Sequence, residues 1–98
     1  METYRLSWVQ SQSTFVQDQQ VLASIDGVAA AQLGSNLPSN VGFIDYDFPT
    51  DSQVSWFVRT IGDNATQKDS IPDVFKAENL DKVQAATGLA HTWIAHKD

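Results

Sequence analysis

The sequence predicts an all-β protein, an antiparallel β-sandwich, and three observations lead to that class. Apolar and polar residues alternate along residues 53–61, which is the pattern of a half-buried strand. Similar short stretches recur at roughly ten-residue spacing with turn-forming residues between them, as in sandwiches built of short strands. Helical periodicity is nearly absent before Asn79. The 98 residues contain no cysteine, and they suffice for one core that needs no disulfide.

The first half of the chain predicts three strands. Residues 4–9 and 20–25 alternate in hydropathy, and a polar stretch separates them. Asp26 and Gly27 follow the second strand and predict a type I′ turn, because both tolerate the positive φ angles that this turn requires. The returning strand is 28–33. Its alanines also permit a helix, but a six-residue segment after such a turn favours a strand.

The second half predicts a loop at 34–40, a strand at 41–49, the strand at 53–61 and a last strand at 69–76. Pro72 cannot donate to a ladder, so the last strand is expected at a sheet edge. The inward positions of these strands predict one core, made of Trp8, Val21, Ile25, Tyr46, Trp56 and Val58.

Two segments of the sequence resemble a known family. The stretch "YRLSWVQSQS" followed by "QQVLASIDG" resembles strands B and C of a fibronectin type III-like or immunoglobulin-like domain, with Trp8 as the core tryptophan of strand B. The stretch "FPTDSQVSWFVRTIGDNATQKDS" is similar to the E–F corner and F strand of that family. Val54 stands where the family usually has a corner tyrosine, so the hydrogen bond of that tyrosine is expected to be missing. The resemblance implies a fold and leaves function open, because this fold serves many functions.

The chain is expected to divide into a sandwich at 1–78 and a C-terminal extension at 79–98. Residues 79–88 could form one or two helical turns. Residues 89–96, "LAHTWIAH", read as one more strand. The resemblance begins at strand B, which leaves one sheet edge beside residues 4–9 open, and an uncovered edge is adhesive. We therefore expect the extra strand to pair there, in its own chain or on a neighbour, with Trp93 at least half-buried.

Charge and hydropathy argue against several kinds of partner. The net charge is −6 and the six basic residues are scattered, so no patch is predicted that could bind nucleic acid or an anionic membrane. No apolar run approaches the length of a membrane span, and the N-terminal residues do not read as a secretory signal.

No catalytic residue, cofactor or metal site is predicted. His91 and His96 lie five residues apart and are expected on opposite faces of a strand, so a shared metal is not expected. Asp45 and Asp47 share a face and could contribute to a calcium site, but solvated carboxylates are favoured because no ligand-dense loop is present. The sequence shows neither a nucleophile elbow nor a glycine-rich phosphate loop, so an enzyme is not expected.

Aromatic and apolar residues outside the predicted core are the candidates for contacts with a partner. They are Phe15, Phe57, His91, Trp93 and Ile94. A chain that begins with Met, carries no export signal and has an adhesive fold suggests a virion component made in the host cytoplasm. We expect a non-enzymatic structural protein of a bacteriophage, such as a capsid decoration or accessory subunit, that is oligomeric on a protein lattice. The alternative is an extracellular carbohydrate- or cell-surface-binding module from a larger secreted protein.

Overall fold

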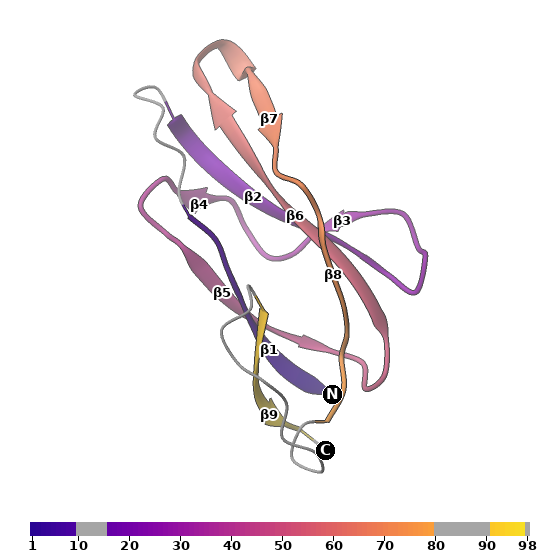
Figure 1. Ribbon diagram of the computed structural model, residues 1–98. Coiled ribbons are helices and arrows are strands. Elements are labelled where there is room, and N and C mark those ends of the chain that lie inside the picture. The colour runs from indigo at the N-terminus through magenta and orange to yellow at the C-terminus, as the bar shows by residue number, and fades with distance from the viewer. Residues whose placement is uncertain (10–15, 80–90, 98) are drawn as a thin grey trace.

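The structure, a computed structural model, describes residues 1–9, 16–79 and 91–97, and these form an all-β chain (Figure 1). The strands in this part of the chain are β1 (Glu2–Ser7), β2 (Val16–Ile25), β3 (Ala31–Gln32), β4 (Leu37–Pro38), β5 (Phe43–Phe48), β6 (Gln53–Gly62), β7 (Gln67–Asp69), β8 (Asp73–Lys76) and β9 (His91–His96). A 3₁₀ turn, Asp63–Ala65, joins β6 to β7. The predicted helical turns at 79–88 lie outside the described residues, apart from Asn79.

The strands form two antiparallel sheets. The first sheet has the order β5-β1-β9, and the second has the order β3-β2-β6-β7, with β4 also paired to β2 and β8 also paired to β6. Buried side chains from both sheets form one cluster, in which Leu6 and Phe48 of the first sheet meet Val21 and Trp56 of the second. The result is a β-sandwich-like fold, in agreement with the predicted class.

The predicted core is largely confirmed. Val21, Trp56 and Val58 are buried, and Trp8 and Ile25 are partly buried against them. Tyr46 was predicted in this core and is instead 36% exposed. It lies on β5, an edge strand of the first sheet, where neighbours cover only part of its ring. The ring contacts Phe48, with ring centroids 5.2 Å apart.

The turn after β2 has the predicted geometry, but the strand after it is much shorter than 28–33. Asp26 and Gly27 have φ angles of 52° and 80°, and Val28 N donates to Ile25 O across the turn. Only β3 then pairs with β2. The chain next buries Leu33, and β4 pairs with β2 inside the segment predicted as a loop at 34–40.

The predicted strand 69–76 is divided into β7 and β8, which both pair with β6. Pro72 lies between them, in the edge position that its missing N–H predicts. Ser70 continues the ladder between the two strands, because its N–H donates to Val58 O and its hydroxyl accepts from Val58 N. The hydroxyl thus replaces a backbone carbonyl at this point.

The predicted pairing of the C-terminal strand with the N-terminal strand is present within one chain. β9 runs antiparallel to β1, and Tyr4 lies opposite Trp93. Trp93 is partly buried against the core, as expected. β1 is therefore the central strand of the first sheet, with β5 on its other side (Figure 1).

Candidate interaction surface

The residues singled out from the sequence do not form one surface. Phe15 lies outside the described residues. Phe57 is on the outer face of the second sheet, half-buried beneath the guanidinium of Arg59, which lies 5.7 Å from the ring centroid. His91 and Trp93 face the core, whereas Ile94 is 41% exposed. Of the three candidates on β9, only Ile94 is exposed to a partner without movement of the strand.

A β-bulge in β9 overturns the expectation that His91 and His96 point to opposite faces. The pairing shifts register between Thr3 and Tyr4, and Ile94 is the extra residue on β9. His91 therefore lies opposite Leu6, and His96 lies opposite Glu2, both on the inward face. Strict alternation predicts opposite faces for residues five apart, and one extra residue cancels that difference.

Glu2 holds the end of β9 through a buried hydrogen-bond network. Its side chain has no exposed surface. Thr50 Oγ1 donates to Oε2 at 2.6 Å, Trp93 Nε1 donates to Oε1 at 3.1 Å, and His96 Nδ1 bonds to Oε2. Burial raises the pKa of this carboxyl, but the three hydrogen bonds and the nearby imidazole together outweigh burial. The pKa of Glu2 thus lies below its usual value, and the carboxylate is favoured.

Asp73 holds the other end of β9. Its Oδ2 accepts from Trp56 Nε1 at 2.9 Å and bonds to His91 Nδ1 at 2.8 Å. The imidazole of His91 also stacks on Phe75, with centroids 4.1 Å apart and planes 15° from parallel. A core indole and the C-terminal strand therefore share one carboxylate oxygen.

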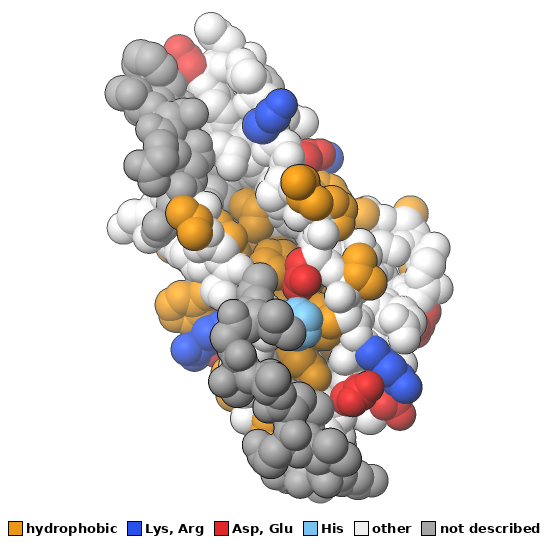
Figure 2. Space-filling model, viewed as in Figure 1, with side chains coloured by type: hydrophobic (Ala, Val, Ile, Leu, Met, Phe, Trp, Pro, Cys, Tyr) orange, Lys and Arg blue, Asp and Glu red, His pale blue; other side chains and the backbone are white. Residues whose placement is uncertain are grey.

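In the described part of the chain, the edges of both sheets carry exposed apolar side chains. Between β7 and β8, Ile71 is 92% exposed, and Val74 on β8 is 64% exposed. Figure 2 shows hydrophobic side chains gathered in the middle of one face, with acidic and histidine side chains beside them. In the first sheet, Phe43 on the edge strand β5 is also exposed. The guanidinium of Arg5 lies 4.6 Å from its ring centroid.

The outward carboxylates of β5 are engaged by neighbouring cations. Arg5 donates to both oxygens of Asp45 at 2.9 and 3.1 Å, and Lys97 Nζ donates to Asp47 at 3.1 Å. The hydrogen bond from Arg5 lowers the pKa of Asp45, and hydrogen bonds from Thr3 and Lys97 lower that of Asp47. Asp45 and Asp47 were considered for calcium, but the described residues contain no group of three or more His, Asp or Glu side chains placed to hold a metal ion.

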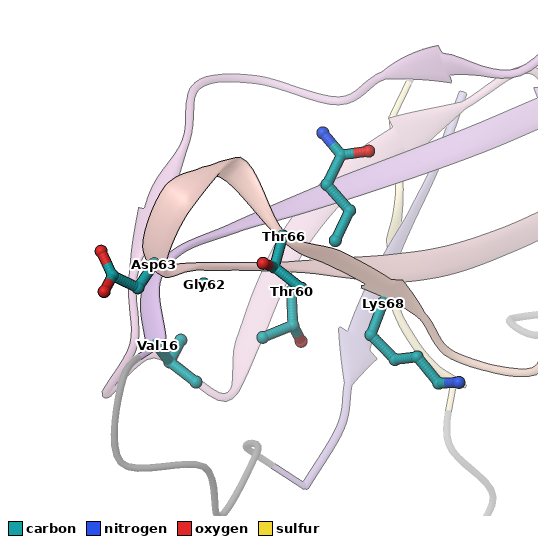
Figure 3. A pocket seen from close by; sticks show the side chains of 7 residues that line it. Val16, Thr60, Gly62, Asp63, Thr66 and Lys68 are labelled. Atoms are coloured by element: carbon teal, nitrogen blue, oxygen red, sulfur yellow. The ribbon is translucent and has the colours of Figure 1, made fainter.

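A hollow of about 300 Å³ lies at one end of the second sheet (Figure 3). Its walls come from the start of β2, the end of β6 and the turn into β7, and include Val16, Thr60 and Thr66. The side chains of Asp63 and Lys68 extend in opposite directions at its two sides (Figure 3). The two hydroxyls and the two separated charges do not form a nucleophile–base pair, and most of the lining surface is apolar.

Two buried polar residues, Glu2 and Gln19, stand at positions that the sequence pattern marks as inward. Glu2 stands two positions before Tyr4 and four before Leu6, which places it on the inward face of a strand. Gln19 likewise alternates with Val21. It is buried, accepts from Trp8 Nε1 at 2.8 Å and donates to the carbonyls of Pro38 and Val41. A polar residue at an inward position marks a buried hydrogen-bond network.

Comparison with known proteins found no match to this chain among family models, curated proteins or solved structures. Within the described residues, no helix is long and apolar enough to cross a membrane.

Proposed function

We propose that this chain is a non-enzymatic structural subunit of a bacteriophage virion, a capsid decoration or accessory protein that binds a repeating protein lattice. The observation that carries the proposal is the pair of sheet edges with exposed apolar side chains, Ile71 and Val74 on one sheet and Phe43 on the other. Strand edges of this kind accept contacts from neighbouring chains. In the virion the protein would be oligomeric.

The strand order supports a fibronectin type III-like arrangement within this proposal. On this proposal β1, β2 and β6 would correspond to strands B, C and F of that family, because β1 lies in one sheet and β2 lies beside β6 in the other. β9, which pairs with β1, would then stand in for strand A of the family. Val54 is buried at the position of the corner tyrosine, so that tyrosine is absent here.

The two imidazole–carboxylate pairs also favour a structural role. Glu2 with His96 and Asp73 with His91 each join β9 to the rest of the chain. Trp93 is partly buried against the core and Arg59 lies over the ring of Phe57, so neither ring is fully exposed to a sugar. This makes the carbohydrate-binding alternative the weaker of the two.

The test is co-sedimentation of the purified protein with assembled particles of the phage that encodes it. We expect binding, and we expect Ile71→Asp and Val74→Asp to reduce it. Val28→Asp is the matched control, because Val28 is exposed to a similar degree (68%) on the turn after β2. Absence of binding by the parent protein would refute the proposal, and glycan binding that is lost in Phe57→Ala would favour the alternative.

A further inference from the structure

Within the described residues, the contacts that hold β9 come from other strands and from the turn before β6. β1 supplies the backbone ladder, and Glu2 lies at one end of it. Thr50, which precedes β6, and Asp73 on β8 supply the remaining polar contacts to the network. The described contacts to β9 therefore come from residues distant from it in the sequence.

The strand and the site have complementary chemistry. On the inward face of β9, the nitrogens of His91, Trp93 and His96 all point to carboxylate oxygens. The site offers Glu2 and Asp73 as acceptors, and the apolar rings of Tyr4 and Phe75 lie between them, each near the imidazole of His91. A strand with nitrogen donors at these three positions fits, and the chain itself supplies one.

Withdrawal of β9 would remove stabilising contacts from the site beside β1. Glu2 would keep one hydrogen bond, from Thr50, and would lose those from Trp93 and His96. The carboxylate would lose two hydrogen bonds that stabilise it, and the edge of β1 would lose its ladder partner as well. An empty site would therefore take up any matching strand.

The covalent connection does not confine β9 to its own chain. Eleven residues, 80–90, join Asn79 to His91, and at 3.3–3.6 Å per residue they can span up to roughly 36–40 Å. The two shorter dimensions of the molecule are 27 and 21 Å. The connection is long enough to reach a copy that lies alongside.

We propose that β9 also docks in trans, so that the C-terminal strand of one copy occupies the site beside β1 of a second copy. The same contacts are made in both arrangements, so exchange has a low cost, and local concentration decides between them. In dilute solution β9 stays in its own chain. Where copies are held at local concentrations of about a millimolar or more, exchanged strands link neighbours. That strands are exchanged on a phage particle rests on the proposed function. Exchange between copies in solution does not depend on it.

Two single-cysteine variants test the proposal. Arg5 and Thr92 are opposite each other across the β1–β9 ladder and both are exposed. Opposed residues of an antiparallel pair lie within disulfide distance. Arg5→Cys and Thr92→Cys are purified separately, mixed, refolded together at a series of concentrations from micromolar to millimolar, and oxidised. Because the parent chain has no cysteine, only strand exchange places the thiol at position 5 of one copy opposite the thiol at position 92 of another.

We expect a covalent dimer whose yield rises with concentration and whose linked peptides, identified by mass spectrometry, contain residue 5 joined to residue 92. Dimers that contain only 5–5 or 92–92 linkages, or no dimers at millimolar concentration, would overturn the proposal. Circular dichroism under reducing conditions checks that each variant folds. If either does not, Thr3→Cys and Ala95→Cys, opposed on the other side of the bulge, replace them. Because no particles are present, this result does not depend on lattice binding.

Discussion

Trp56 and His91 hydrogen-bond to the same oxygen, Asp73 Oδ2, although one belongs to the central ladder of the second sheet and the other to the C-terminal strand of the first. Replacement of the carboxylate leaves the indole N–H of a buried tryptophan without its acceptor. We expect Asp73→Ala to lower the free energy of unfolding by about 1–3 kcal/mol, measured by urea denaturation. Asp63→Ala, on the exposed turn after β6, is the control and should change stability little.

Trp56 and Phe57 are adjacent aromatic residues with opposite placements. Trp56 is buried in the core, whereas Phe57 lies on the outer face of the second sheet. We expect Trp56→Ala to cost about 3–5 kcal/mol of stability and Phe57→Ala much less. Thermal melting followed by circular dichroism compares them. Equal melting temperatures for the two variants would contradict the orientation of β6.

Acid should destabilise the protein through its engaged carboxyls. The pKa values of Glu2, Asp45, Asp47 and Asp69 all lie below their usual values. A group whose pKa is lower in the folded state contributes stability above its unfolded pKa and loses that contribution as the pH falls through the folded pKa. We therefore expect stability to fall as the pH is lowered below about 4.

The variant Glu2→Gln isolates the buried member of this set. It should reduce stability near neutral pH and make the decline in acid less steep, because one carboxyl with a lowered pKa is removed. Chemical denaturation at a series of pH values checks both effects. If the stabilities of the parent and of Glu2→Gln fall in parallel as the pH is lowered, Glu2 does not contribute to the acid sensitivity.

Removal of residues 89–98 should destabilise the fold and increase aggregation. Burial of an aromatic side chain the size of Trp93 contributes roughly 2–3 kcal/mol, and the deletion also exposes the edge of β1. Melting temperature and size-exclusion chromatography of the truncated chain measure the two effects. A truncated protein with the stability and oligomeric state of the full chain would show that β9 is a passive extension.

Nucleic acid should not bind at physiological salt. The net charge is −6, and three of the six cations, Arg5, Arg59 and Lys97, are already paired with aspartates. Phosphate contacts require available Lys and Arg side chains. A gel-shift assay at micromolar protein tests this, and a shift that weakens with added salt would contradict it.

Two-residue alternation predicted the presence of β1, β2, β5 and β6, but not all of their bounds. β1 begins at Glu2 and β2 at Val16, where residues 4 and 20 were expected. The failures have local physical causes. Residues 28–33 alternate weakly, and hydrogen bonds to β2 form only at β3 and again at β4. Tyr46 follows the alternation but lies on an edge strand, a placement that the pattern cannot specify.

Less of the candidate site than of the fold could be predicted from the sequence. Trp93 was expected to be at least half-buried, yet its acceptor, Glu2, is the second residue of the chain. Contacts between residues this far apart depend on which strands become neighbours. The bulge at Ile94 depends on a further shift in the pairing of β9 with β1. Alternation within β9 alone therefore placed His96 on the wrong face.

The bulge in β9 also makes the two margins of the first sheet, its edge strands β9 and β5, differ in their ability to pair with a further strand. Bulges increase local twist and interrupt the regular spacing of backbone donors and acceptors, so the outer side of β9 is a poor template for another strand. No register shift interrupts the pairing of β5 with β1. The sheet thus has a terminating margin at β9 and an extendable margin at β5, and growth by strand addition would proceed in one direction only.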